Sequence, residues 1–330
     1  MPLSDEDGTL PAHRLVTLNV GERGGGEGLL ARFPFAQAPN AAMDRIGNVP
    51  WLGGDVATEH WRADGSARFV TDDDDHGAVA AASLCVLSHR LPADEDQALA
   101  EATGEAYLSL LGRARELGYP WLLRTWHFVP DINRGSGDGE RYRQFCLGRD
   151  RALAESGFRQ GELGAATAVG SQGRDLRIHC LMGRAPGEPI ENPRQVAAYR
   201  YPRVHGPRPP AFARAVALPL TGGDCAVMIS GTASIVGHET MHPGDTPAQL
   251  EETIANLESL LGEAARRLER PRLAQFDGNS LLRIYVRRSA DWANVWPRLR
   301  RAWPNARLTG LQADICRREL MVEIEAFHRG

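Results

Sequence analysis

The order of apolar segments after residue 78 constrains the fold of this chain more than any other feature. Strand-like runs and helix-like spacings follow one another as strand, helix, strand, helix, strand, strand, and the same order then occurs a second time. The first series places its helices near 94–118 and 140–155, and the second places them near 246–268 and 291–302. The predicted strands lie at 79–87, 121–129, near 165, and at 176–181, 226–236, 281–286, 307–315 and 320–327.

Helices that follow strands at this spacing pack against a sheet and cover one of its faces. The sequence therefore predicts an α+β fold with two similar β-α-β-α-β-β halves, in which the helices of each half lie on one face of its sheet. Residues 1–78 are rich in glycine, proline and acids, which predicts additional short strands and long loops.

A connection rich in proline and arginine separates the two halves. It runs from Glu188 to Arg214, reads EPIENPRQVAAYRYPRVHGPRPPAFAR, and has six prolines in 27 residues. Proline fixes φ and removes a backbone donor, so this density excludes a helix and any long central strand. Loops rich in arginine and tyrosine often line sites, because arginine offers a fixed fork for carboxylates. We therefore predict an N-terminal half at 1–187, a connection at 188–214 that contributes to the site, and a C-terminal half at 215–330.

The composition excludes several classes of function. The chain has no lysine, so all 38 basic residues are arginine, and enzymes that need a lysine amine are excluded. The net charge is -4 and no basic cluster is present, so we expect no nucleic-acid partner. No apolar run approaches the roughly 18 residues of a membrane span, so we expect no membrane either. Five scattered cysteines and an acidic N-terminus without signal-peptide features predict reduced thiols in the cytoplasm.

One short motif suggests zinc. His238, Glu239 and His242 spell H-E-x-x-H, in which two histidines one helical turn apart bind the metal and the glutamate activates water. That chemistry needs a helix through all five residues. The preceding SGTASIVG is small and β-branched, and Pro243-Gly244 follow at once, which favours a strand and a turn. We expect no metal here, and a zinc peptidase is the least favoured function.

The last strand, LMVEIEAF, alternates between two faces. Val322 and Ile324 point one way, whereas Glu323 and Glu325 point the other way among apolar neighbours. A carboxyl group held beside apolar groups has its charged form desolvated, which raises its pKa and suits it to general acid catalysis. Glu323, which lies beside Met321 on the same face of the strand, is the better candidate for the general acid. The alternative is an edge strand whose glutamates are solvated.

Four stretches of the chain resemble the chorismatase family, whose members split chorismate into pyruvate and a ring acid. They are RYRQFCLGR (141–149), ENPRQVAAYRYPR (191–203), SGTASIVGH (230–238) and ICRRELMVEIE (315–325). The resemblance covers both halves and implies a fold similar to Rid (imine deaminase) and chorismate-mutase-like proteins, in agreement with the repeated order. It also implies a reaction without a cofactor, and it matches the family's acidic residue on the last strand to Glu323.

The substrate of this family explains the residue types. Chorismate carries two carboxylates, a hydroxyl and an enol ether, so a site must hold two anions apart and deliver a proton to the enol methylene carbon. The resemblance implies Glu323 and Cys316 as catalytic residues, with arginines for the carboxylates and hydroxyl groups near the ring. The substrate-binding candidates are Arg143, Arg149, Tyr199, Tyr201, Arg203, Ser230, Gly231, Thr232 and Arg287.

Product choice in the family depends on what attacks after protonation. Members with alanines at two positions admit water and form a dihydroxycyclohexadiene acid, whereas members with glycine and cysteine there favour the ring hydroxyl and form 3-hydroxybenzoate. This chain has Gly231 and Cys316, so the resemblance implies 3-hydroxybenzoate and pyruvate. A water-adding chorismatase and a mixed 3-/4-hydroxybenzoate synthase are the near alternatives, and a Rid-like imine deaminase or binding protein is the alternative of another class. Because two related halves can imitate a subunit contact, we expect a monomer.

Overall fold

The structure is a computed structural model that describes residues 18–21, 28–35, 49–63, 65–72, 75–92 and 99–330. The start of the helix predicted from residue 94 lies outside these residues, as do most of the loops predicted before residue 50.

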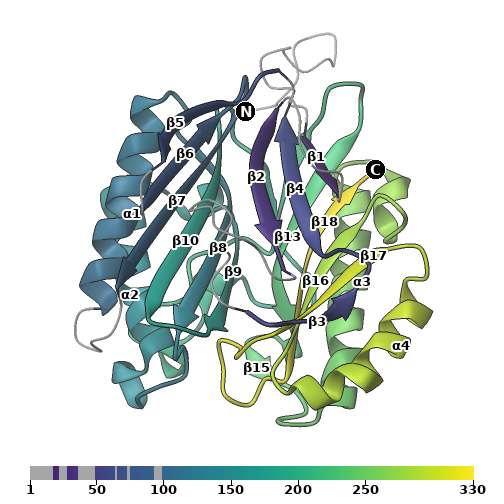
Figure 1. Ribbon diagram of the computed structural model, residues 1–330. Helices are drawn as coiled ribbons and strands as arrows, with labels where there is room; N and C mark the ends of the chain where they lie inside the picture. The colour runs from purple at the N-terminus through teal and green to yellow at the C-terminus, as the bar shows by residue number, and fades with distance from the viewer. Residues whose placement is uncertain (1–17, 22–27, 36–48, 64, 73–74, 93–98) are drawn as a thin grey trace.

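Two large sheets form the body of the molecule (Figure 1). In spatial order, the strands of the first sheet are β5 (Arg68–Asp72), β6 (His76–Ala80), β7 (Leu84–Pro92), β10 (Asp175–Gly183), β8 (Trp121–Pro130) and β9 (Ala165–Ser171). Those of the second are β11 (Glu188–Ile190), β12 (Ala215–Pro219), β13 (Cys225–Ala233), β18 (Val322–Arg329), β16 (Leu281–Val286), β17 (Arg307–Gln312) and β3 (Trp51–Gly54).

The two sheets repeat one topology. The order β6-β7-β10-β8-β9 in the first corresponds to β12-β13-β18-β16-β17 in the second. In each sheet the neighbouring strands are antiparallel except for one parallel pair, β8 with β9 and β16 with β17. A parallel pair needs a crossover, and a helix supplies it in both halves. The predicted β-α-β-α-β-β order is confirmed in both series.

Four helices cover the outer faces of the sheets. They are α1 (Leu99–Glu116), α2 (Arg141–Glu155), α3 (Thr246–Arg267) and α4 (Trp292–Ala302). Figure 1 shows α1 and α2 on one side of the molecule and α3 and α4 on the other, with both sheets between them. Apolar cores join each sheet to its helices, represented by Leu110 with Ile178 and by Leu257 with Ile324. The predicted α+β class, with helices on one face of each sheet, is confirmed.

A third, small sheet lies between the two large ones. Its strands are β1 (Leu18–Gly21), β4 (Thr58–Ala63) and β2 (Leu29–Pro34). Trp61 of β4 packs edge-on against Trp126 of the first large sheet, at 4.9 Å between ring centroids, and against Phe327 of the second, at 5.7 Å. The aromatic rings of the small sheet therefore join the two halves through one shared apolar core.

One predicted strand is wrong. The apolar run expected as a single strand at 79–87 is the hairpin β6–β7, whose strands are separated by residues 81–83. Val79 and Val86 pair across it, and both are buried. The turn between them reads Ala-Ala-Ser and has no glycine, proline, asparagine or aspartate, so the sequence does not mark it clearly.

The connection has neither a long helix nor a long strand, as its proline density predicted. Within 188–214 the structure has only the three-residue strand β11 and single 3-10 turns at Ala198–Arg200 and Arg203–His205. No described helix of the protein is long and apolar enough to cross a membrane.

Candidate active site

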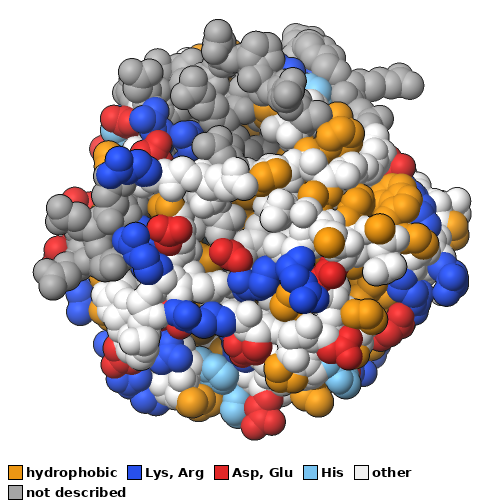
Figure 2. Space-filling model, turned by 60° about the horizontal axis from the view of Figure 1, so that its bottom comes forward, with side chains coloured by type: hydrophobic (Ala, Val, Ile, Leu, Met, Phe, Trp, Pro, Cys, Tyr) orange, Lys and Arg blue, Asp and Glu red, His pale blue; other side chains and the backbone are white. Residues whose placement is uncertain are grey.

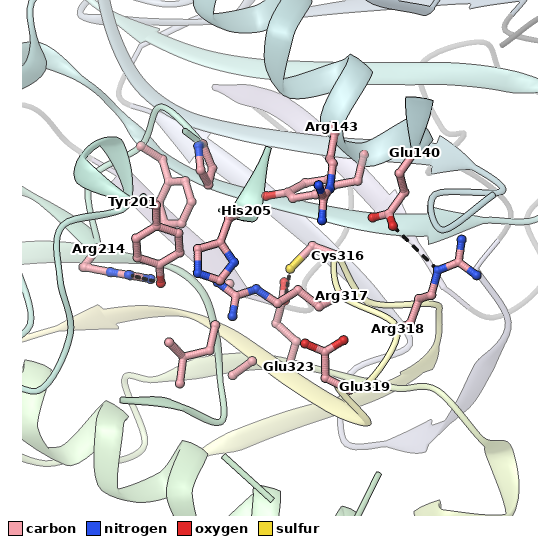
Figure 3. Close-up of a pocket in the computed structure, with 16 residues that line it drawn as sticks. Glu140, Arg143, Tyr201, His205, Arg214, Cys316, Arg317, Arg318, Glu319 and Glu323 are labelled. Atoms are coloured by element: carbon pink, nitrogen blue, oxygen red, sulfur yellow. Dashed lines mark hydrogen bonds and ion pairs between the residues drawn. The ribbon is translucent and has the colours of Figure 1, made fainter. Parts of the chain in front are cut away.

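A pocket with two adjoining chambers lies between the halves, and Figure 3 shows the residues that line the larger chamber. We call the larger chamber, with a volume of about 150 Å³, the outer chamber, and the smaller one, of about 40 Å³, the inner chamber. The walls of the pocket come from α2, strands β8 and β9, the connection, the end of β13, the loop between β17 and β18, and β18 itself. The residues that line both chambers are Tyr142, Pro210, Phe212, Gly231, Cys316 and Glu323.

Glu323 faces this pocket from the middle of the second sheet. Its strand β18 lies between β13 and β16, so the edge-strand alternative is wrong. The neighbours Val322 and Ile324 point the other way, into the core beneath α3 and α4. The residue is 4% exposed although its carboxyl group lines both chambers. The alternation of the strand thus puts a carboxyl group in a place that bulk water scarcely reaches.

Burial decides the protonation of Glu323. Desolvation of the charged form, with the like charge of Glu325 as the second cause, raises the pKa of Glu323 to about 8, while Arg124 acts in the opposite direction. At neutral pH most of this side chain is therefore the neutral acid, which can donate a proton.

Cys316 lies beside that acid. Its thiol donates a long hydrogen bond from Sγ to Oε2 of Glu323, at 3.9 Å. Burial, reinforced by the negative charge of Glu323, raises the pKa of the Cys316 thiol well above its usual value. The two predicted catalytic residues are therefore adjacent, with the cysteine as a neutral thiol.

Gly231 leaves space for the carboxyl group of Glu323. A Cβ at this position would lie 2.2 Å from Oε1 of Glu323 and 3.2 Å from Cγ2 of Thr167. Its backbone N–H donates to Oγ1 of Thr167 at 3.0 Å. The absence of a side chain at residue 231 is therefore what lets β13 pass next to the acid.

Arg149 lines the inner chamber and is 3% exposed. Its Nε donates to the hydroxyl of Tyr107 at 2.6 Å, and its Nη1 donates to the carbonyl of Ala211. The buried Nη2 has no partner among the described residues. An unpaired buried guanidinium nitrogen is costly, and a carboxylate in the chamber would satisfy it.

Arg143 and Arg203 meet the same carboxylate but differ in position. Arg143 lines the outer chamber, and its Nη1 is 4.0 Å from Oδ1 of Asp138. Arg203 is exposed and forms a two-pronged ion pair with Asp138, at 2.9 and 2.5 Å, outside the residues that line the pocket. Of the two predicted arginines, only Arg143 reaches the chamber.

Tyr201 lines the outer chamber and is tied to an arginine that the sequence did not single out. Arg214 donates from Nη2 to the Tyr201 hydroxyl at 2.7 Å, and it lines the same chamber. The Nε of Arg214 is buried without a partner among the described residues. Arg214 ends the proline-rich connection, and with Tyr201, His205, Pro210 and Phe212 it makes this segment a wall of the pocket.

Three predicted binding residues lie behind the pocket wall. The hydroxyl of Ser230 donates to the carbonyl of Ala213 at 2.6 Å, and that of Thr232 donates to the carbonyl of Ser230 at 2.9 Å. Both are buried and neither lines a chamber. Tyr199 packs against the core of the first half, outside the lining of either chamber.

Arg287 also lies outside the lining, where it fastens the loop between β17 and β18. Its Nε donates to the carbonyl of Leu320 at 2.8 Å, and its Nη2 donates to the carbonyls of Ile315 and Arg317 at 3.1 and 2.9 Å. It also pairs with Asp314. All these contacts hold the segment that carries Cys316.

Arg317 and His205 line the outer chamber without having been predicted (Figure 3). Burial and the charge of Arg317 lower the pKa of His205 to about 4, so the imidazole is neutral at physiological pH. Arg317 lies next to the predicted Cys316, and His205 follows Arg203 in the connection. Both residues lie inside segments that the sequence had already assigned to the site, and this position is the signal that could have found them.

The H-E-x-x-H motif forms a hairpin. Strands β14 (Ile235–Val236) and β15 (Glu239–Thr240) pair with each other, so the motif is a strand and a turn, as its neighbours predicted. Its first histidine, His238, contacts His205, with 3.1 Å between Nδ1 and Nε2. Among the residues that the structure describes, no group of three or more histidines, cysteines or acids is arranged to hold a metal.

Charges of both signs surround the pocket. Arg318 lies 3.6 Å from Oε2 of Glu140, and both line the outer chamber. Figure 2 shows arginine and acidic side chains close together over the lower face of the molecule, without one continuous positive area on that face. Chemically, the pocket combines one neutral carboxylic acid with guanidinium groups, which suits an acid-catalysed step on an anionic substrate.

Comparisons with known proteins agree with this geometry. The family described as "Chorismatase FkbO/Hyg5-like, N-terminal" matches residues 59–182. A 3-hydroxybenzoate synthase from Streptomyces hygroscopicus is 41% identical over 234 residues, which are 68% of this chain and 68% of that protein. A chorismatase from the same organism is 39% identical over 281 residues, which are 81% of this chain and 78% of that protein.

A solved structure extends the match to almost the whole chain. The crystal structure of a chorismatase has a TM-score of 0.78 and 30% sequence identity, covering 96% of this chain and 98% of that one. The relatives span more than two thirds of both chains, and the solved fold contains both halves and the connection. This chain belongs to the chorismatase family.

Proposed function

We propose that this protein converts chorismate to 3-hydroxybenzoate and pyruvate, with Glu323 as the general acid. The observation that carries the proposal is a buried, neutral carboxyl group at the junction of two chambers that arginines line. The name of the relative that is 41% identical supports the same product.

The arginines account for binding of the dianion. Arg149 lines the inner chamber and has a buried Nη2 without a partner among the described residues, and Arg143, Arg214 and Arg317 line the outer chamber. One carboxylate of the substrate can thus be held in each chamber, and Glu323 lines both. Charge-assisted hydrogen bonds of this kind orient a ligand as well as bind it, which places the enol ether against the acid.

Proton transfer starts the reaction. Glu323 gives its proton to the methylene carbon of the enolpyruvyl group, which becomes an oxocarbenium ion, and the acid becomes a carboxylate. The pair of electrons in the bond between the ring carbon and the ether oxygen then leaves with that oxygen, which becomes the keto oxygen of pyruvate. General acid catalysis of this type accounts for about 10² to 10⁴ of rate enhancement.

Gly231 and Cys316 support attack by the ring's own hydroxyl. As the bond to the ether oxygen breaks, this hydroxyl attacks the neighbouring ring carbon that pyruvate leaves, giving an epoxide-like intermediate that opens, loses a ring proton and becomes aromatic. The hydroxyl and the ring each lose one proton. The carboxylate of Glu323 takes up one of these protons and the phenol oxygen takes up the other, so no water is consumed. Cys316, next to the acid at 3.9 Å, would assist removal of the ring proton.

The nearest second candidate is a chorismatase that adds water. The relatives that are 39% and 37% identical carry the name chorismatase, which does not state the product.

The product identifies the reaction. Purified protein is incubated with chorismate, and the products are separated by chromatography and identified by ultraviolet spectrum and mass. We expect pyruvate and aromatic 3-hydroxybenzoate in equal amounts, and we expect Cys316→Ala to divert product toward the diene acid. A wild-type product that is wholly the non-aromatic diene acid would contradict the assignment.

The remaining expectations belong to the same proposal. The reaction needs no cofactor and the protein works as a cytoplasmic monomer on a small molecule, with domain limits at 1–187, 188–214 and 215–330. The repeat of one topology within the chain supports the monomer, because each half already has a partner.

A further inference from the structure

Next to the pocket lies a buried chain of four charged side chains that the proposed reaction does not use. Glu59 of β4 accepts from Nε and Nη2 of Arg283 of β16, at 2.8 and 2.6 Å. Nη1 of Arg283 donates to Oε1 of Glu325 of β18, at 3.0 Å, and Oε2 of Glu325 accepts from Nη2 of Arg124 of β8. Each of the four residues is at most 3% exposed. We refer to these residues as the Glu59–Arg124 network.

Stability alone is a weak reason for such a network. Removing four charges from water is costly, and well-packed apolar residues in their place are often neutral or stabilising. The network has two cations and two anions, so its own charges balance, yet two of its members, Glu325 and Arg124, still act on Glu323. A self-balanced network beside a functional acid therefore suggests a role in the chemistry of that acid.

The network ends at the pocket. Nη2 of Arg124 also donates to Oγ1 of Thr167, at 2.6 Å, and the same oxygen accepts the backbone N–H of Gly231 at 3.0 Å. Thr167 and Gly231 both line the inner chamber. Glu325 is two residues from Glu323 on β18, so the two carboxyl groups share one face of the strand.

Glu323 has no arginine within hydrogen-bonding distance among the described residues, and its contact is the thiol of Cys316. Arg124 acts on it electrostatically, yet the guanidinium is turned to Glu325 and Thr167. The Nη1 of Arg124 is buried without a partner among the described residues, so this arginine has a donor to spare. Without Glu325, Arg124 would be the natural cation for Glu323.

We propose that Glu325 is a positioning residue that engages Arg124 and thereby keeps Glu323 in the protonated form that donates to substrate. This inference rests on the proposed function of Glu323. The charged and titratable groups that face Glu323 are Glu325 of its own strand, Arg124 of β8, Tyr142 of α2, Arg214 of the connection and Cys316 of the loop before β18. Of these, only Glu325 and Arg124 belong to the network, and they act on Glu323 with opposite sign.

The test is the pH dependence of kcat/KM for chorismate. An acid that must be protonated gives a rate that is flat at low pH and falls above its pKa, so the wild-type rate should fall above about pH 8. Glu325→Gln removes the like charge and releases Arg124, so the fall should begin about one pH unit lower or more. Arg124→Met removes the cation, so the fall should move to higher pH.

Two further variants separate charge from structure. Tyr285→Phe removes a hydroxyl that donates to Oε1 of Glu325 at 3.1 Å but changes no charge, so the fall should stay at the wild-type pH. The double variant Arg124→Met with Glu325→Gln removes one charge of each sign, and its fall should lie between those of the single variants. This variant keeps the network neutral and so provides a test if a single variant does not fold.

The outcomes separate the role of Glu325 from the role of Glu323. Opposite shifts in the two single variants support the role of Glu325, because a loss of packing would lower the rate without moving the profile in opposite directions. A wild-type fall near pH 8 that neither variant moves would overturn the role of Glu325 alone. A wild-type rate that does not fall at high pH would count against Glu323 as the acid, and so against the proposed function.

Discussion

At the scale of single residues, the site depends on one close approach. Gly231 and Glu323 lie on neighbouring strands, and the carboxyl oxygen Oε1 occupies the space where any other residue would have its Cβ. Most real contacts of a Cβ are longer than 3.4 Å. The glycine therefore sets where the proton donor lies, in addition to any room it leaves for the substrate ring.

Gly231→Ala should displace the acid. With the new Cβ only 2.2 Å from Oε1, the carboxyl group must turn away, and a misplacement of about 1 Å is enough to cost about 10²-fold in rate. We expect a fall of at least about tenfold in kcat, with product diverted toward the diene acid. The measurement is turnover together with product identity by chromatography.

Gly112→Ala is the matched control. Gly112 lies in α1, and a Cβ there would meet nothing within 4 Å, so rate and product should remain those of the wild type. If Gly231→Ala matched this control in both readouts, the contact between residue 231 and the acid would have no influence on catalysis.

At the scale of elements, the loop between β17 and β18 carries the thiol and Arg317 into the pocket. Arg287, at the end of β16, spans this loop with donors to the carbonyls of Ile315, Arg317 and Leu320. The backbone of a loop without regular structure needs such partners for its carbonyl groups. Arg287, which we expected to bind substrate, therefore holds this loop of the pocket wall in place.

Arg287→Met should loosen that wall. Hydrogen exchange of the amides in 314–321 should become faster and kcat/KM should fall, because the loop loses several hydrogen bonds of roughly 1 kcal/mol each. Arg288→Met is the control, since Arg288 is exposed and pairs with Asp291 on the surface. Unchanged exchange in Arg287→Met, with only KM raised, would instead indicate direct binding of substrate.

The elements could largely be predicted from the sequence because their signals are local. The leucines of α3 recur at helical spacing, and Asp245 caps its first turn by accepting from the N–H of Ala248 at 3.1 Å. The alternation of β18 likewise predicted the face on which Glu323 lies. The hairpin β6–β7 could not be divided, because its turn at 81–83 reads Ala-Ala-Ser and has no glycine, proline, asparagine or aspartate to mark it.

At the scale of the whole molecule, the pocket is assembled from segments that are far apart in the chain. Arg149 comes from the first half, Arg214 from the connection and Glu323 from the second half. The resemblance to chorismatases implied that arginines hold the substrate, but not which of them, because arginines recur throughout the chain and their partners are distant. Glu59 and Arg283 are 224 residues apart, and no local pattern pairs them.

The central claim is that Glu323 donates the proton that begins the reaction. The most direct measurement is the rate of chorismate consumption near pH 7 by Glu323→Gln, with circular dichroism to verify the fold and exposed Glu116→Gln as the control. We predict a loss of about 10² to 10⁴-fold in kcat for Glu323→Gln and none for the control. A folded Glu323→Gln protein whose rate stayed within about tenfold of the wild type would contradict the claim.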